Sequence, residues 1–213
     1  MTDCIQGFIL TGGASRRMGK DKAALVFEGQ TFVEHIAREL LPVSSSVKLV
    51  GTLSGSEKPK ARLKAELQTD LAPHDEFEIV PDVYPAWGAL GGVHAALAAC
   101  TAPWALVVAC DFPFVTTELF QRLASLREDA DAVAPVQHDE IPQPLCTLYR
   151  QAPCLDVATE LIKSGERKPI ALLQSVRTRW VSFSELSNLT DANHFFDNIN
   201  TPEDYARLSS DSA

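Results

Sequence analysis

Positive charge is concentrated directly after a glycine turn near the start of the sequence. An apolar run ends at Leu10, Thr11-Gly12-Gly13 follows, and four cations come within the next nine residues. The cations are Arg16, Arg17, Lys20 and Lys22. Glycines let backbone N–H groups approach phosphate oxygens closely, while Arg contacts such oxygens through a planar fork and Lys as a point charge. The segment predicts a triphosphate site; the alternative is an ordinary turn with solvated charges.

The glycine spacing excludes two common phosphate-binding motifs. The pattern G-x-x-x-x-G-K-[ST] is absent, and Gly12 and Gly13 are adjacent, which G-x-G-x-x-G does not allow. The segment is therefore neither a P-loop nor a dinucleotide-binding turn.

Two aspartates lie at the ends of expected strands. Asp111 comes after the apolar residues 104–109, and Asp82 is at the end of a short strand expected at residues 78–82. Ligands of open α/β sheets bind at the carboxyl ends of the strands, and Mg²⁺ prefers one or two carboxylates together with phosphates and water. Asp111 is our expected Mg²⁺ ligand, with capping of the next turn as its alternative role. For Asp82, a nucleotide contact and a turn carboxylate are equally good interpretations.

Apolar runs alternate with amphipathic stretches along the chain, which predicts an α/β domain with a mostly parallel sheet. We expect strands at about residues 4–10, 47–50, 78–82, 104–109, 132–135 and 145–149. We expect helices at about residues 32–41, 93–99, 116–126, 155–164 and 201–208, the last capped by Thr201 with Pro202 in its first turn. A glycine turn at residues 88–92 should precede the second of these helices.

The chain should form one domain, residues 1–208, followed by a short polar tail at 209–213. Its 213 residues, 46% of them hydrophobic, are enough to bury the core of a single domain without disulfides. Residues 51–77 are rich in Gly, Ser, Pro and charged side chains, so we expect an exposed excursion there.

Composition also limits the partners. The formal net charge of −9 disfavours nucleic acid and anionic membranes, although a local basic loop still suits a polyanionic small substrate. No signal peptide or apolar run of membrane-spanning length is visible, so we expect a cytoplasmic protein. The five cysteines lack C-x-x-C spacing and are interpreted as small buried hydrophobic residues. The five histidines show no metal-ligand spacing, and we assign them no chemistry.

Residues 10–25, LTGGASRRMGKDKAAL, resemble the pattern L-[AT]-G-G-x-S-x-R-M-G-x-D-K-x-L. That pattern belongs to the nucleotidyltransferases that include the molybdenum cofactor guanylyltransferases. The resemblance continues through Asp82, GALGG at 88–92, CDFP at 110–113, GERK at 165–168 and FDNINTPED at 196–204. Two residues depart from the family pattern: Ala89 replaces the usual proline, and Gly51 stands where many members carry an asparagine.

The resemblance implies a Rossmann-like three-layer fold of the nucleotide-diphospho-sugar transferase type. The implied reaction transfers GMP from GTP to the terminal phosphate of molybdopterin, with Mg²⁺ and with release of pyrophosphate. Arg17 and Lys22 would be catalytic. The implied nucleotide contacts are Leu10, Thr11, Gly12, Gly13, Lys22, Asp82 and Asp111, and the candidates for pterin contact are Arg167, Lys168, Asn198 and Asn200.

Roles that need no substrate stay open for the pterin candidates. Asn198 and Asn200 could organise the turn before the last helix, and Arg167 and Lys168 could form a solvated helix end. Two other functions also stay open: the sister reaction with CTP or another nucleotidyltransfer on the same fold, and a noncatalytic GTP-binding module. Transient contact with other cofactor-biosynthesis or acceptor proteins is expected as well.

Overall fold

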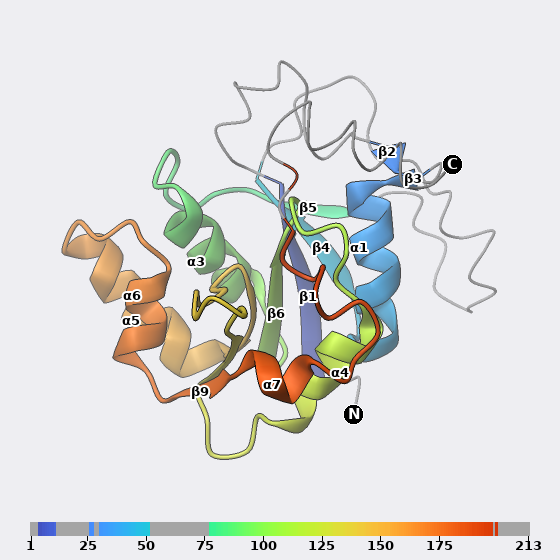
Figure 1. Ribbon diagram of the computed structural model, residues 1–213. Coiled ribbons are helices and arrows are strands. Elements are labelled where there is room, and N and C mark those ends of the chain that lie inside the picture. Colours follow the sequence, from blue (N-terminus) through green and yellow to red (C-terminus); the bar gives the residue numbers. More distant parts are fainter. Residues whose placement is uncertain (1–3, 12–25, 28–29, 52–76, 198, 200–213) are drawn as a thin grey trace.

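The described residues form a seven-stranded sheet covered by helices on both faces (Figure 1). The computed structural model describes residues 4–11, 26–27, 30–51, 77–197 and 199. The strand order is β5-β4-β1-β6-β8-β7-β9. The strands are β1 (Ile5–Leu10), β4 (Val47–Val50), β5 (Glu78–Val80), β6 (Trp104–Ala109), β7 (Ala132–Pro135), β8 (Cys146–Arg150) and β9 (Thr178–Val181). A separate pair joins β2 (Val26–Phe27) to β3 (Gln30–Thr31).

One strand of the sheet runs against the others. All neighbouring pairs are parallel except those made by β8, which is antiparallel to β6 on one side and to β7 on the other. Because β8 is antiparallel to both of its neighbours, β6 and β7 run in the same direction. The expected mostly parallel α/β sheet is confirmed.

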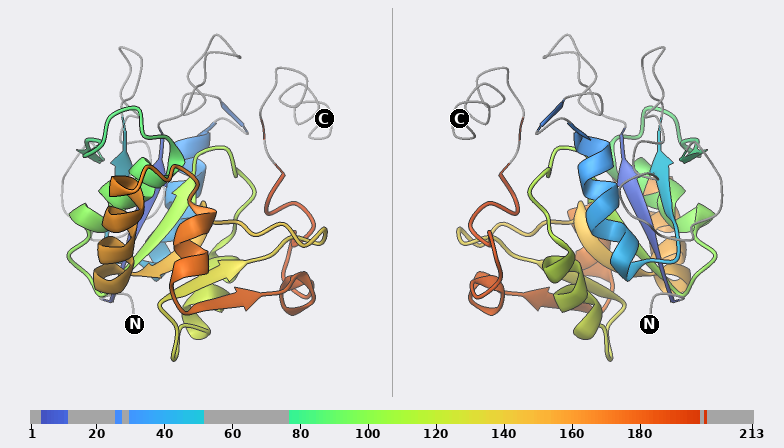
Figure 2. Two further views of the ribbon diagram at one scale, coloured as in Figure 1. Left: turned by 90° about the vertical axis from the view of Figure 1, so that its left-hand side faces the viewer. Right: turned by 90° about the vertical axis from the view of Figure 1, so that its right-hand side faces the viewer.

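The helices divide between the two faces, as the two side views show (Figure 2). One face carries α1 (Phe32–Leu40), the 3-10 turn η4 (Leu41–Val43), α4 (Thr117–Ser125) and α7 (Phe183–Leu186). The other carries α3 (Ala89–Ala99), α5 (Gln151–Lys163) and α6 (Ile170–Ser175). Strand β1 shows why both faces need cover: Ile5 and Ile9 join the core on the first face, whereas Phe8 and Leu10 join the core on the second.

Helix α1 begins where its sequence provides a capping box. Thr31 N donates to Glu34 Oε2 at 2.8 Å, and Glu34 N donates to Thr31 Oγ1 at 3.2 Å, so two backbone donors of the first turn are satisfied. Farther along α1, Glu39 Oε2 accepts from Thr117 N at 2.6 Å. This bond fixes the start of α4 against α1.

Several boundaries differ from the expectation. Helix α3 begins at Ala89, so most of the expected glycine turn is helical, and α5 begins at Gln151, four residues early. The elements α6, β9 and α7 were not anticipated. The expected helix at 201–208 and residues 52–76 of the expected excursion lie outside the described residues.

The cysteine interpretation needs one correction. Cys4 is exposed, because it lies just before β1 begins, whereas Cys100, Cys110, Cys146 and Cys154 are buried as expected. Among the described residues, no helix combines the length and apolarity needed to cross a membrane.

Candidate nucleotide site

Four parallel strands end level with one another. The register pairs Leu10 with Val50 and with Ala109, and Val50 with Val80. We call this edge, formed by the ends of β5, β4, β1 and β6, the carboxyl rim. Open α/β sheets bind ligands at such an edge. The sheet therefore has the edge at which we expect the nucleotide to bind.

Backbone hydrogen bonds continue the sheet by one residue beyond the level row. Gly51 N donates to Val80 O at 2.9 Å, Thr11 N to Val50 O at 2.9 Å, and Cys110 N to Leu10 O at 3.1 Å. The Thr11 hydroxyl also donates to Val50 O, at 3.0 Å. Because the Thr11 N–H is engaged within the sheet, it is not available to a phosphate oxygen.

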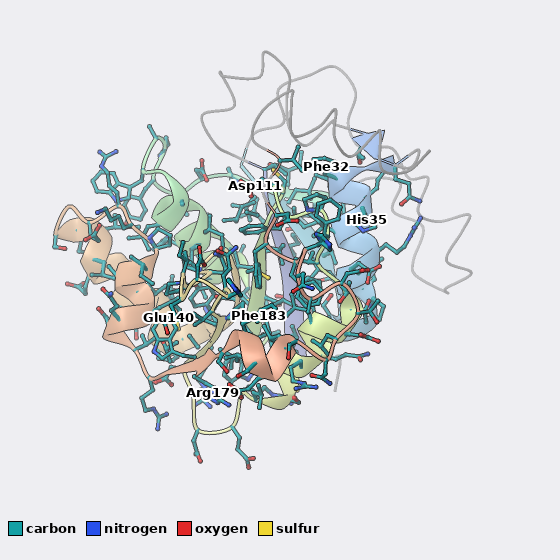
Figure 3. All side chains as sticks on the ribbon, in the orientation of Figure 1. Phe32, His35, Asp111, Glu140, Arg179 and Phe183 are labelled. Atoms are coloured by element: carbon teal, nitrogen blue, oxygen red, sulfur yellow. The ribbon has the colours of Figure 1, made fainter. Side chains whose placement is uncertain are left out.

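Asp82 and Asp111 each lie two residues beyond the level row. Three strand spacings of about 4.8 Å separate the ends of β5 and β6, so the backbones at Val80 and Ala109 are roughly 14 Å apart. Asp82 is exposed and Asp111 is half-buried. Figure 3 shows Asp111 at the carboxyl end of the central strands.

The donor set on the carboxyl rim suits Mg²⁺ rather than a metal held entirely by protein. No group of three or more His, Cys, Asp or Glu side chains able to hold a metal occurs in the described part of the chain. A single carboxylate at the end of a buried strand is compatible with Mg²⁺, which takes most of its remaining ligands from phosphates and water. Asp111 therefore fits the role that the sequence predicts for it.

The peptide that carries Asp111 is fixed from two sides. Phe112 N donates to Ala109 O at 3.3 Å, and Ile199 N donates to Asp111 O at 3.4 Å. The Phe112 ring meets the Phe196 ring edge to face, with centroids 6.0 Å apart. Phe196 and Ile199 therefore lie at the carboxyl rim beside Asp111.

The N-terminus of helix α3 lies at the carboxyl edge of the sheet, because α3 is the next element after β5 in the chain. Gly88 is the N-cap residue with φ 75, a left-handed conformation that favours glycine, and it makes no side-chain cap. The first-turn N–H groups and the helix dipole can attract a negatively charged or carbonyl oxygen there.

The turn before α3 is tied to the connection between α5 and α6. Trp87 Nε1 donates to Glu166 O at 2.8 Å, and Arg167 Nη1 donates to Ala86 O at 3.2 Å. The Arg167 guanidinium carbon lies 4.5 Å from the centre of the Trp87 ring, a cation–π arrangement. The Glu166 carboxylate accepts from the N–H groups of residues 167 and 168 and these bonds lower its pKa.

The predicted site residues thus fall into three groups. The structure brings Leu10, Thr11, Asp82 and Asp111 to the carboxyl rim. It places Arg167 beside the turn 84–88 and gives Lys168 no contact with that turn among the bonds described. The remaining predicted residues lie outside the described residues: Gly12, Gly13, Arg17, Lys22, Asn198 and Asn200.

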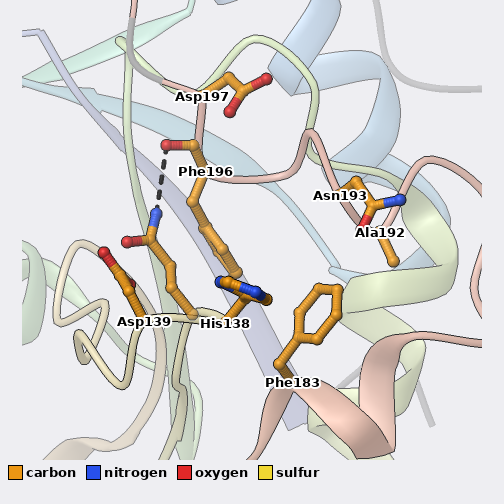
Figure 4. A pocket seen from close by; sticks show the side chains of 8 residues that line it. His138, Asp139, Phe183, Ala192, Asn193, Phe196 and Asp197 are labelled. Carbon is orange, nitrogen blue, oxygen red and sulfur yellow. Dashed lines mark hydrogen bonds between the residues drawn. The ribbon is translucent and has the colours of Figure 1, made fainter.

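Sequence reasoning missed a pocket away from the carboxyl rim, which we call the loop pocket (Figure 4). Its volume is about 260 Å³. It is lined by Gln137, His138, Asp139, Phe183, Ala192, Asn193, Phe196 and Asp197. These residues come from segments far apart in sequence, so no local spacing could have revealed the pocket.

A mostly parallel sheet covered by helices on both faces, with parallel strands that end level, is typical of α/β domains that bind ligands at the carboxyl edge of the sheet. The family model of the MobA-like NTP transferase domain matches residues 7–179, and the chain belongs to this family. The expectation drawn from the sequence resemblance is thereby confirmed.

Curated relatives match nearly end to end. A probable molybdenum cofactor guanylyltransferase of Pelotomaculum thermopropionicum is 33% identical, over 94% of this chain and 90% of the relative. The molybdenum cofactor guanylyltransferase of Vibrio campbellii is 32% identical, over 94% and 92%.

Solved structures agree on the fold. Molybdopterin-guanine dinucleotide biosynthesis protein A from Archaeoglobus fulgidus superposes with a TM-score of 0.73 at 26% identity, covering 97% of this chain and 98% of its own. A cytidylyltransferase acting on 2-C-methyl-D-erythritol 4-phosphate, from Thermus thermophilus, gives 0.66 at 16% identity, covering 96% and 97%, and shows likeness of fold alone.

Proposed function

We propose that this protein is a molybdenum cofactor guanylyltransferase, which transfers GMP from GTP to the terminal phosphate of molybdopterin or its molybdenum form. The observation that carries the proposal is the nearly full-length match to relatives that bear this name. The position of Asp111 on the carboxyl rim supports it. We also propose that the reaction takes place in the cytoplasm.

In the proposed reaction, an oxygen of the acceptor phosphate attacks the α-phosphorus of GTP. The bond from that phosphorus to the bridging oxygen breaks, and pyrophosphate leaves with the electron pair. A phosphate monoester is already anionic at neutral pH, so the protein needs no strong base. What it must supply is alignment of the two substrates and compensation of their negative charge.

The chain's own groups divide this work. Asp111 would hold Mg²⁺, which supplies positive charge to the phosphates when bound. Arg17 and Lys22 would neutralise the triphosphate further. The fixed peptide at Asp111 keeps its carboxylate in place, because both Ala109 O and Ile199 N bond to that stretch of backbone.

Base selection would depend on backbone more than on side chains. Gly51 ends β4 on the carboxyl rim and has no side chain with which to contact a base. The N-terminus of α3 still offers N–H donors to a carbonyl oxygen such as guanine carries. These features support GTP only indirectly, so base choice has to be measured.

The deciding experiment follows pyrophosphate release with each of the four nucleoside triphosphates, with and without molybdopterin, in the presence of Mg²⁺. We expect turnover with GTP only, and only when acceptor is present. Preference for CTP would establish the sister cytidylyl reaction instead. GTP binding without turnover would favour the noncatalytic module. Chelation by EDTA should abolish turnover, and added Mg²⁺ should restore it.

A further inference from the structure

The loop pocket lies on the opposite side of β6 from the expected nucleotide. β6 and β7 point the same way, and the register through β8 places Leu106 level with Val133. Asp111 and His138 each lie five residues beyond that row. Only β8 separates the two strands, so the backbones at the row are about 10 Å apart. The glycine turn and Asp82 follow β1 and β5, on the other side of β6.

The loop pocket is also connected to Asp111 along the chain. Gln137 Nε2 donates to Phe196 O at 3.3 Å, the bond drawn in Figure 4. Three residues farther on, Ile199 N donates to Asp111 O. Three residues span at most about 10 Å, so a ligand seated in the pocket can extend a short arm to the carboxyl rim.

The walls combine aromatic rings with uncharged or negative polar groups. Phe196 is buried and Phe183 half-buried, and His138 meets Phe183 edge to face with centroids 5.9 Å apart. In Figure 4, Asp139 and Asn193 stand on opposite sides of the Phe196 ring. The eight lining residues include no lysine or arginine. Such walls repel a phosphate and accept hydrogen bonds from amino and ring N–H groups.

The size of the loop pocket narrows the class of ligand. Pockets for drug-sized molecules measure roughly 300–1,000 Å³. At about 260 Å³, this one holds a fused ring better than a whole nucleotide. A flat heterocycle with donors at its edge would pack against the phenyl rings and donate to Asp139, Gln137 or Asn193.

We propose that the loop pocket binds the amino-substituted fused heterocycle of the acceptor, while the acceptor phosphate extends toward Asp111. The inference rests on the proposed function and deepens it. Guanine and pterin share a 2-amino-4-oxopyrimidine edge, which is the chemistry that the pocket recognises. The position of the pocket beyond β6 assigns it to the acceptor rather than to GTP.

The test uses free pterin, whose fluorescence reports binding without any turnover, and guanosine as the competing source of the same edge. Asp139→Asn should weaken pterin binding about tenfold, because it removes a charged acceptor. It should also raise the KM for molybdopterin while leaving the KM for GTP unchanged. The matched control is Glu140→Gln, an exposed neighbouring carboxylate that does not line the pocket.

A second variant protects the test against local unfolding. Asn193→Ala changes the opposite wall of the loop pocket and should weaken pterin binding in the same way. A rise in the KM for GTP, or weaker guanosine binding with pterin unaffected, would assign the loop pocket to the nucleotide and overturn the inference. If neither Asp139→Asn nor Asn193→Ala changed the binding of pterin or guanosine, the inference would be overturned too. Pterin binding without any guanylyl transfer would leave the pocket intact and remove the proposed reaction instead.

Discussion

The two sides of β6 are built in different ways. From β5 to β6, parallel strands end level and backbone bonds close the edge, so the main chain defines the surface. Beyond β6, the antiparallel strand β8 breaks the pattern, and side chains from a hairpin and from residues 183–197 form the loop pocket. Every nucleoside triphosphate has the same phosphates, which backbone donors can recognise. An acceptor must be distinguished by its ring, and that needs side chains.

The largest expected effect is at the β6 end of the carboxyl rim. Asp111→Asn should lower kcat about 100-fold or more, since it weakens the electrostatic stabilisation of the phosphates. It should also abolish any Mg²⁺-dependent tightening of GTP binding, measured by calorimetry. Asp129→Asn is the control, because Asp129 is exposed in the turn before β7, at the opposite edge, and Asn tolerates its φ of 59. Near wild-type turnover in Asp111→Asn would remove the metal role.

The second effect concerns the packing of α3 against the preceding turn. At Gly91 an added Cβ would lie 2.9 Å from Trp87 Cβ and 3.3 Å from Tyr84 O, so Gly91→Ala must displace the turn. We expect the KM for GTP to rise roughly tenfold and the free energy of unfolding to fall by about 1–3 kcal/mol.

Gly92→Ala is the matched control for that change. Its Cβ would meet Leu10 Cδ1 at 3.4 Å, an ordinary contact, so the variant should keep its KM and gain slightly in helix stability. If Gly91→Ala and Gly92→Ala changed the KM for GTP equally, the turn before α3 would have no role in GTP binding.

A smaller effect should follow loss of the Arg167–Trp87 contact. An exposed cation–π pair contributes about 0.5–1 kcal/mol, so Arg167→Ala should raise the KM for GTP by a factor of roughly 2 to 5 and leave the KM for molybdopterin unchanged. Lys168→Ala, beside it, should change neither. A rise in the KM for molybdopterin alone would instead make Arg167 an acceptor contact. The acceptor would then not be bound only on the loop-pocket side of β6.

The smallest effect depends on pH and concerns α7, which supplies Phe183 to the loop pocket. The Arg179 guanidinium, aided by Ser182, lowers the pKa of Glu185 to about 2 from 4.5. The pair's stabilisation is therefore fully present above about pH 5 and is lost as pH falls toward 2. Glu185→Gln should cost about 1 kcal/mol or less at neutral pH.

Chemical denaturation across this pH range measures the Glu185 effect, with the exposed Glu128→Gln as control. The difference between wild type and Glu185→Gln should shrink steadily as pH falls. A difference that stayed constant would mean that the ion pair does not stabilise α7.

The parts of the fold that could be predicted are those buried on both faces. Strand β6 is a continuous apolar run and β1 is apolar apart from Gln6; every residue of both is buried, and their bounds agree with the sequence within one residue. The same runs locate Asp111, since the polar residue after a buried strand must emerge at the edge of the sheet.

The errors have separate physical causes. The glycines of α3 suggest a turn, but at Gly91 the helix needs a residue without Cβ because Trp87 packs there. Pro153 hides the start of α5, although proline is tolerated in a first turn whose N–H groups lack helical partners. The capping box from Ser182 to Glu185 was a usable sign of α7. The loop pocket had no such sign, because tertiary contacts alone bring its walls together.

The reversed strand β8 has a consequence for redesign. Parallel neighbours must be joined by a crossover that travels the length of the domain, whereas an antiparallel strand returns where its predecessor stopped. Residues 136–145 make that return here, closed by bonds such as Gln143 N to Pro135 O at 2.9 Å. Replacing this tip between Pro135 and Cys146 would alter no crossover helix. The tip carries three of the eight residues that line the loop pocket, so a redesign of that pocket would have to change the segment from Phe183 to Asp197 as well.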